Sequence, residues 1–437
     1  MDPLLLTILI FGMLLFLLAI GVPLVFCFGM TAITFIALQW GMPALYQVAI
    51  TAFGEWTSFL LLAAPLFVLM ANILERSGVA EDLYDMMYMW LGGIRGGLAI
   101  GTIAICAIFA AMSGISAVAT VTMGLIALPS MIKRNYDPKM AVGSVAAGGT
   151  LGILIPPSVI MILYGALTGA SVGKLFVAGL IPGILLAVLF MAYIAVVCFF
   201  KPVLGPPVPL EERFTWKEKL KSTKGAILPV GLIFMVLGLI YMGVATPTEA
   251  AGLGAFGSFV VLIINKRFSW AIVKEALEKT CRLSGMVLWI LLSAKCFSQV
   301  YTALGASDLI LNIFSNLELN RWVILIGMQI VLIIMGMFMD PGGIIMICTP
   351  IFVPLAQSLG FDLIWFGILF TINMELGYIT PPFGFNLFYM KNLASPLGID
   401  MTTIYRSVIP FVVLDIVGLI LIMLFPDIAL WLVGQMK

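Results

Sequence analysis

The sequence predicts an all-α polytopic membrane protein built from two inverted repeats, each with a re-entrant hairpin and a broken transmembrane helix. Of the 437 residues, 62% are hydrophobic and 10% are charged, whereas a soluble domain has roughly 25% charged residues. Apolar runs of about 20 residues, the length that crosses ~30 Å of hydrocarbon, recur along the chain. The chain is therefore expected to cross a lipid bilayer many times.

Two proline pairs indicate the repeat. The segments Gly152-Ile-Leu-Ile-Pro-Pro157 and Gly377-Tyr-Ile-Thr-Pro-Pro382 lie 225 residues apart, and Pro129 and Pro354 are separated by the same number of residues. A proline pair removes two backbone donors and pushes the preceding residue out of helical geometry. Broken backbone survives in hydrocarbon only where protein or a cavity supplies the missing partners. Two broken helices at matching places therefore indicate the substrate site of a secondary transporter rather than two plain kinks.

The elements of the first half follow in order. The first basic residue is Arg76, so the chain is expected to begin with a retained transmembrane helix rather than a cleaved signal peptide. The apolar run at 96–131 is interrupted at Ala111–Ser116 and has cationic flanks at both ends, which predicts a hairpin that enters and leaves by the cytoplasmic face. The other expected helices of this half are 4–20, 23–40, 55–75, a surface helix at 79–91, the broken helix 138–169, and 176–200.

The middle of the chain is expected on the cytoplasmic side. Residues 201–224 carry six basic and three acidic side chains, and basic loops favour the cytoplasm. Two apolar runs at 225–243 and 250–265 are then expected to form a helix pair that crosses the membrane and returns to the cytoplasmic side. The segment 268–283 has apolar side chains on one helical face and charged ones on the other, which predicts a separate helix lying along the cytoplasmic surface.

The second half repeats the first with opposite polarity. A helix near 283–303 runs outward, so the run 322–358, interrupted at Met339–Gly343, is a hairpin that opens outside. A broken helix at 363–391 and a last helix at 408–425 complete the repeat. The predicted organisation is 1–95 scaffold helices and first arm, 96–200 first repeat, 201–282 linker with scaffold pair and amphipathic arm, 283–321 entry helix and second arm, and 322–437 second hairpin, broken helix and terminal helix.

The composition also excludes several classes of protein. Histidine is absent, which excludes histidine-based triads, histidine zinc motifs and a histidine proton relay. The six cysteines have no metal or redox spacing, and 22 basic against 21 acidic side chains give no reason to expect nucleic acid. The chain is predicted not to be an enzyme and to need no cofactor other than a coupling ion.

The hairpin tips and helix breaks supply oxygen ligands for that ion. Exposed carbonyls and hydroxyls are hard donors for a small cation, and helix N-termini attract an anion. Because histidine is absent and hydroxyls cluster at these places, Na⁺ is favoured over H⁺. The candidate sodium ligands are Ser113, Ser116, Gly149, Thr150, Gly152, Gly336, Asp340, Gly377 and Thr380.

Substrate contacts are expected near the same places, each with a structural alternative. Asp340 before a proline is also a good helix cap, and Glu375 could have a structural partner instead of a functional role. Side chains on the broken helices can simply pack, and a cation at a helix end can simply anchor the topology. The substrate candidates are Ser116, Pro156, Tyr164, Glu375, Phe383, Asn386 and Arg134.

Four motifs resemble one known family, the large membrane subunit of tripartite ATP-independent periplasmic (TRAP) transporters. They are Met112–Ala117, Ala147–Ser158, Met339–Gly343 and Glu375–Gly384. The resemblance implies an elevator-type, Na⁺-driven importer of small organic anions, such as carboxylates or sulfonates, in the cytoplasmic membrane of a bacterium or archaeon. It also implies a periplasmic substrate-binding protein, and a small four-helix membrane subunit that would be a separate chain.

By the same resemblance, one Na⁺ would bind around Gly336, Gly377 and Thr380, and another around Ser113, Gly149 and Thr150. The alternative functions are a passive channel or an intramembrane enzyme. An enzyme would need acid–base or nucleophilic groups built without histidine, and a channel would not need two occluding hairpins. Nothing in these residues selects one organic anion.

Overall fold

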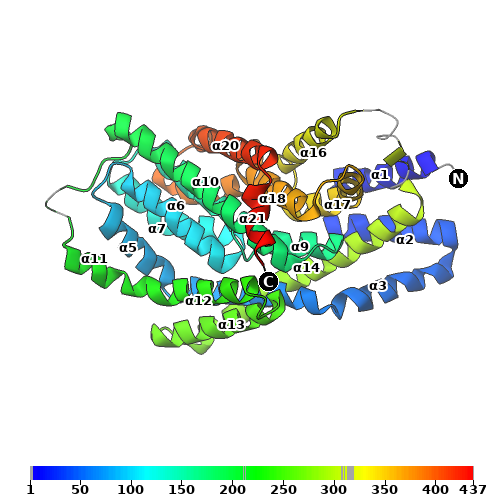
Figure 1. The fold of residues 1–437 in the computed structure, drawn as a ribbon, viewed down its shortest axis with the longest axis horizontal. Coiled ribbons are helices and arrows are strands. Elements are labelled where there is room, and N and C mark those ends of the chain that lie inside the picture. Colours follow the sequence, from blue (N-terminus) through cyan, green and yellow to red (C-terminus); the bar gives the residue numbers. More distant parts are fainter. Residues whose placement is uncertain are drawn as a thin grey trace.

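The computed structural model describes residues 3–209, 211, 213–306, 309, 311–312 and 319–436, and within these ranges all regular structure is helical. Eight helices of the described residues are long and apolar enough to cross a membrane, or nine if one bent pair counts as a single span. Figure 1 shows the whole bundle in sequence colours. The prediction of an all-helical, multi-pass chain is therefore confirmed.

The helices outside the repeats are called the frame here. They are α1 (Pro3–Ala19), α2 (Leu24–Trp40), α3 (Tyr46–Trp56), α4 (Ala63–Glu75), α12 (Lys224–Tyr241), α13 (Pro247–Ile264) and α14 (Trp270–Ala303), with α5 (Val79–Leu91) and α11 (Trp216–Ser222) at one edge. The helix expected at 55–75 is present as 59–75, whereas α3, which precedes it, was not predicted; the chain bends by 54° between 42–56 and 59–75. The bend lies at Thr57 and Ser58, and the 3₁₀ turn Phe59–Leu62 begins the second segment.

One expectation about the frame is wrong. The segment 268–283 was expected as a surface helix separate from the helix at 283–303, but both belong to the continuous, 34-residue α14. Ser284 and Gly285 do not stop it, because tertiary contacts fix its first half against α4. Asn72 donates a hydrogen bond to Thr280 at 3.1 Å, and Arg76 pairs with Glu275. At about 51 Å, α14 is longer than the hydrocarbon layer.

Each repeat contains five helices in the same order. Repeat 1 is α6 (Gly97–Ser113), α7 (Ser116–Lys133), α8 (Pro138–Leu154), α9 (Val159–Thr168) and α10 (Val172–Phe200). Repeat 2 is α16 (Arg321–Gly336), α17 (Pro341–Ser358), α18 (Leu363–Ile379), α19 (Phe385–Ala394) and α20 (Met401–Leu424), followed by α21 (Asp427–Gly434). Both predicted hairpins and both broken helices are confirmed as helix pairs. Parts of the expected second arm, residues 307–308, 310 and 313–318, lie outside the described residues.

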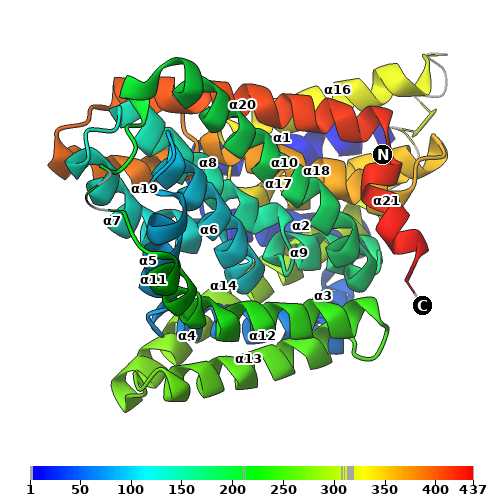
Figure 2. The same cartoon turned by 60° about the vertical axis from the view of Figure 1, so that its left-hand side comes forward.

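The first halves of the two broken helices form the centre of the molecule. Every residue from Met140 to Leu154 in α8 and from Ile364 to Gly377 in α18 is buried. Both are apolar on all faces, which is typical of a helix surrounded by others. In Figure 2, α12 and α13 run side by side along one side of the molecule and α20 runs along the opposite side. The helix breaks therefore lie deep in the molecule.

Candidate functional site

The tip of each hairpin packs against the helix break of its own repeat. In repeat 1, α6 ends at Gly114, whose φ of 62° is left-handed, a conformation that favours glycine. The backbone N–H of Val159 donates a 3.3 Å hydrogen bond to the Gly114 carbonyl, and a Cβ on Gly114 would lie 2.3 Å from the Pro157 carbonyl oxygen. Gly152 faces the tip in the same way, since its Cβ would lie 3.2 Å from Ile115 and Ser116.

Repeat 2 makes the corresponding contact with two glycines. A Cβ on Gly336, at the end of α16, would lie 2.9 Å from the Cα of Gly377 in α18, and a Cβ on Gly377 would lie 3.0 Å from the Gly336 carbonyl oxygen. The backbones of the hairpin and the broken helix therefore touch. The sequence placed Gly336 and Gly377 in one candidate site, and the structure brings them together.

The first candidate site contains a hydroxyl that the sequence analysis missed. Thr120 lies on α7, and a Cβ on Gly149 of α8 would lie 1.9 Å from its Oγ1. The Thr120 side chain is fully buried, and its Oγ1 has no hydrogen-bond partner among the described residues. Buried polar atoms are rarely left without partners. A sequence signal existed, because Thr120 lies one helical turn after Ser116 and so faces the same neighbour.

Ser116 and Asn386 join the two repeats at the first hairpin tip. Ser116 Oγ donates to Asn386 Oδ1 at 3.0 Å, although the residues are 270 positions apart. Asn386 Nδ2 donates to the Ala146 carbonyl of α8 at 3.1 Å. Ser116 does not cap α7, because Ile115 occupies the N-cap position and no side chain bonds there. Ser113 makes only long contacts with Ile115, of 3.4 and 3.5 Å.

A second link between the repeats joins residues at equivalent positions. Thr150 Oγ1 lies 3.1 Å from Glu375 Oε1, and these residues are separated by the 225-residue step of the repeat. The same hydroxyl donates to the Ala147 carbonyl at 2.6 Å. Equivalent side chains of an inverted repeat meet only near the symmetry axis. Thr150 and Glu375 therefore lie near the axis that relates the two repeats.

Asp415 is another buried group that the sequence analysis missed. It lies in the interior of α20, its side chain is fully buried, and neither carboxylate oxygen has a hydrogen-bond partner among the described residues. Helix α20 packs against α18, the helix that carries Glu375. A lone acid within a long apolar run is a functional signal in a membrane helix, and Asp415 meets that description in the sequence.

The remaining candidates of the second sodium site have local structural roles. Asp340 caps α17, because its Oδ2 accepts a 3.2 Å hydrogen bond from the Gly343 N–H. The capping alternative for Asp340 is thus confirmed. Thr380 follows α18 and donates to the Leu376 carbonyl at 2.6 Å. Its hydroxyl oxygen retains lone pairs that can face a cation.

The other four substrate candidates contact other groups. Tyr164 donates to the Leu363 carbonyl at 3.1 Å and packs against Phe370 of α18. Phe383 is half-exposed beside Phe338 and Phe388. Pro156 lines a largely apolar cavity of about 490 Å³ between α10 and α12. Arg134 stacks on Tyr88 with 4.5 Å from its guanidinium carbon to the ring centre, about 27 Å along α7 from Ser116.

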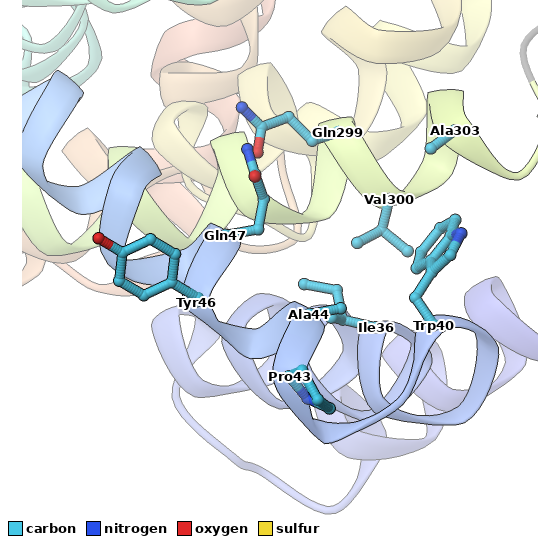
Figure 3. Close-up of a pocket in the computed structure, with 9 residues that line it drawn as sticks. All are labelled: Ile36, Trp40, Pro43, Ala44, Tyr46, Gln47, Gln299, Val300 and Ala303. Carbon is cyan, nitrogen blue, oxygen red and sulfur yellow. The ribbon is translucent and has the colours of Figure 1, made fainter.

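A separate cavity of about 530 Å³ lies in the frame. Figure 3 shows that side chains from α2, from the 3₁₀ turn Met42–Leu45, from the start of α3 and from α14 line it, with Gln47 and Gln299 pointing toward one another. Thr51 donates to Gln299 Oε1 at 2.8 Å beside it. None of the candidate site residues lines this cavity.

Comparisons with known proteins agree with the architecture. The family described as "Tripartite ATP-independent periplasmic transporter, DctM component" matches residues 11–428. Over 386 residues the chain is 38% identical to the C4-dicarboxylate TRAP transporter large permease protein DctM of Pseudomonas aeruginosa, covering 88% of both chains. Over 429 residues it is 31% identical to the isethionate TRAP transporter permease protein DctMQ of Oleidesulfovibrio alaskensis, covering 97% of this chain and 66% of that protein.

A solved structure has a similar fold. The crystal structure of the Alcanivorax borkumensis YdaH transporter aligns with a TM-score of 0.61 and 14% identity, covering 88% of this chain and 89% of that one. The family match extends over almost the whole chain, and its relatives are named as transporter permeases. The chain therefore belongs to the DctM family, the large permease component of tripartite ATP-independent periplasmic transporters.

Proposed function

We propose that the chain is the permease of a Na⁺-coupled importer of small organic anions, and that Na⁺ binds where each hairpin tip meets its helix break. The observation that carries the proposal is Thr120, a fully buried hydroxyl without a partner, in contact with Gly149. An oxygen atom binds a cation through a lone pair that does not already accept a hydrogen bond. Thr120 meets this condition in repeat 1, and Thr380 keeps its lone pairs in repeat 2.

The choice of Na⁺ rests on the chemistry of these donors. Ser113, Ser116, Thr120 and Thr150 offer hydroxyls, and the helix ends at the break offer carbonyls. Hard cations prefer oxygen ligands of this kind. The described part of the chain has no group of three or more His, Cys, Asp or Glu side chains arranged for a metal ion, so a weakly held monovalent cation fits better than a transition metal.

The substrate class and the partners follow from the relatives. One is named for C4-dicarboxylates and another for isethionate, and both ligands are small organic anions. We propose a substrate of this class, delivered by a periplasmic binding protein. The chain spans 66% of the isethionate permease, whose name, DctMQ, adds a Q to the name DctM of the large permease protein. This supports a separate small membrane subunit, of four helices by family resemblance, as the partner of the present chain.

An elevator movement of the two repeats against the frame is part of the proposal. A largely apolar cavity separates α10 of repeat 1 from α12 of the frame, and an apolar contact can slide without breaking oriented hydrogen bonds. Polar contacts cross this boundary elsewhere: Lys295 of α14 donates to the Ala166 carbonyl of α9 at 3.1 Å and pairs with Glu55 of α3, and Arg134 at the end of α7 stacks on Tyr88 of α5. The two repeats are joined to one another through Ser116, Asn386, Thr150 and Glu375, which favours their moving as one body.

Uptake into proteoliposomes tests the proposal. The permease is reconstituted with the small subunit and the cognate binding protein, and uptake of a labelled C4-dicarboxylate is measured with an inward Na⁺ gradient or with K⁺ in its place. We expect uptake only with Na⁺ and the binding protein. Uptake that is independent of both would show a passive channel and overturn the proposal.

Two substitutions locate the ion. Thr120→Val and Thr380→Val should each raise the Na⁺ concentration for half-maximal uptake about tenfold, because each loses one oxygen ligand to a charged group. Thr371→Val is the matched control. Thr371 is buried in α18 and donates to the carbonyl four residues earlier, as Thr380 does, but lies away from the break. Unchanged Na⁺ dependence in both variants, at normal expression, would refute the sites.

A further inference from the structure

A polar pocket lies where three helices of the repeats end on the same side of the molecule. It has a volume of about 250 Å³ and is lined by the first turn of α8, the last two turns of α10 and the first turns of α20. Leu204, which follows α10, forms one wall, and its carbonyl accepts a 3.1 Å hydrogen bond from the Asp137 N–H. At ~30 Å³ per water the pocket has room for roughly eight waters, so it can hold a group larger than a single ion.

Two basic side chains line this pocket, Lys139 in the first turn of α8 and Arg406 in the second turn of α20. Neither takes part in an ion pair of the described residues. The carboxylate of the described lining, on Asp137, accepts hydrogen bonds of 2.8 and 3.2 Å from the backbone N–H groups of Lys139 and Met140, and so caps α8. Two cations against one carboxylate give the pocket a net positive charge, which favours an anion.

An exposed apolar stripe begins at the pocket and follows α20, which runs along the outer side of the bundle beside α10 (Figure 2). After Arg406, the exposed side chains of α20 include Ile409, Val413, Val417 and Ile420. Their spacing places them on the same face of the helix as Arg406. Helices α10 and α20 are long and apolar enough to cross a membrane. The stripe therefore lies at the depth of the lipid chains, with the cation at its end.

Other residues near the pocket are typical of the cytoplasmic boundary of a membrane protein. Lys201 directly follows α10, and Arg95, just before α6, donates to the Phe199 carbonyl at 3.2 Å. Basic residues gather on the cytoplasmic side, and tyrosine is enriched where lipid meets water. Tyr193 lines the pocket, and its ring packs edge-on against Phe411 with 5.4 Å between ring centres. The pocket is therefore placed at the level of the lipid headgroups of the cytoplasmic leaflet, which contains anionic lipids.

We propose that this pocket binds the phosphate group of an anionic phospholipid through Lys139 and Arg406, with an acyl chain lying along Ile409 and Val413. A free anion would use only the positive charge of the pocket. A lipid also uses the apolar stripe, because its headgroup and its chains are covalently joined as the pocket and the stripe are adjacent. Basic pockets between helices on the cytoplasmic side bind phosphate headgroups in this way. Because α8 belongs to repeat 1 and α20 to repeat 2, the bound headgroup links the two repeats.

Photo-cross-linking of the permease with its small subunit in lipid nanodiscs tests the proposal. The nanodiscs contain phosphatidylcholine and a trace of phosphatidylglycerol that carries a diazirine in one acyl chain. We expect this probe to label residues 409–413 at least about fivefold more than a phosphatidylcholine probe with the same chains, the factor that corresponds to ~1 kcal/mol for one basic residue.

Two results of this experiment would overturn the proposal. Equal labelling of residues 409–413 by both probes would show ordinary contact with the bilayer. Labelling of other exposed helices but not of this stretch would show that protein covers the stripe. The comparison of the two probes uses the unaltered chain, so it holds even if a variant fails to fold.

Substitution of the two cations then locates the headgroup. Lys139→Gln and Arg406→Gln should each lower labelling of residues 409–413 by the phosphatidylglycerol probe about fivefold, whereas Arg406→Lys keeps the charge and should retain most of it. Lys174→Gln is the matched control, because Lys174 is an exposed lysine at the opposite end of α10, and it should leave the labelling unchanged. Unchanged labelling in both Lys139→Gln and Arg406→Gln would contradict the proposal.

Competition distinguishes a lipid from a free anion. Unlabelled phosphatidylglycerol in the nanodisc should lower the labelling of residues 409–413, whereas inorganic phosphate at constant ionic strength should leave it unchanged, because phosphate has no chain to bind the stripe. Loss of labelling with inorganic phosphate would show that the pocket selects the free ion and would overturn the lipid assignment. None of these measurements uses uptake or Na⁺, so failure of the proposed transport function would be recognised separately.

Discussion

The two repeats have the same helices but different chemistry at equivalent positions. In repeat 1 the hairpin tip and the helix break carry hydroxyls and glycines, with Ser116 and Thr120 on α7 and Thr150 on α8. In repeat 2 the corresponding region carries acids: Asp340 caps α17, and Glu375 lies opposite Thr150. The skeleton is therefore symmetric, whereas the acids at the hairpin tip and helix break lie in repeat 2.

The contacts that the two repeats share can therefore be distinguished from the groups that only one repeat carries. Close contact of a hairpin with a broken helix occurs in both repeats, through Gly149 and Thr120 in one and through Gly336 and Gly377 in the other. The two proposed sodium sites rest on this shared geometry. Asp340 and Glu375 have no acidic counterparts in repeat 1, where the 225-residue step leads to Ile115 and Thr150.

The largest effect is expected from a cross-link between the repeats and the frame. Ile184 of α10 and Leu237 of α12 line the same cavity. Joining cysteines at these positions with a flexible bifunctional reagent, in a chain lacking its native cysteines, should abolish uptake almost completely, because the repeats could no longer slide. Joining Thr51→Cys to Gln299→Cys, within the frame beside the 2.8 Å hydrogen bond, should leave uptake intact. Full uptake after a confirmed bond between α10 and α12 would argue against the elevator movement.

A smaller effect is expected from adding one methyl group to the glycine contact of repeat 2. Gly336→Ala would place a Cβ 2.9 Å from the Cα of Gly377, and we expect it to lower the free energy of unfolding by about 1–3 kcal/mol, the usual cost of overpacking. Gly327→Ala, on the same helix with no atom within 4 Å of the added Cβ, should be neutral. Thermal unfolding in detergent measures both; equal stability of the two variants would show that the contact is not tight.

The inverted orientation of the repeats predicts a difference in accessibility without a functional change. Lys133 follows the first hairpin and Asp362 the second, and both are exposed. Lys133→Cys should react with an impermeant thiol reagent only from the cytoplasm, and Asp362→Cys only from outside. Labelling in whole cells and in inverted vesicles distinguishes the two sides. Reaction of both positions from the same side would contradict the inverted topology.

Much of the skeleton could be predicted from the sequence. The breaks at 155–158 and 380–384, both hairpins and the α12–α13 pair are present, because proline pairs and apolar run lengths act locally on the backbone. As a family member with eight helices of spanning length in the described part of the chain, it is a multi-pass protein of the cytoplasmic membrane, as expected. Continuity of α14 could not be predicted, since contacts with α4, rather than its own residues, hold its amphipathic half in line.

By itself, then, the sequence determined the fold class, the repeat and the places where helices break, because these depend on length, hydrophobicity and backbone donors. The tertiary structure decided which residues meet there: Thr120 with Gly149, Ser116 with Asn386, and Glu375 with Thr150. Helices α8 and α18 are buried on every side, so hydrophobic periodicity cannot indicate which of their faces contacts which neighbour. Only packing assigns each buried polar group to its partner, or leaves it without one.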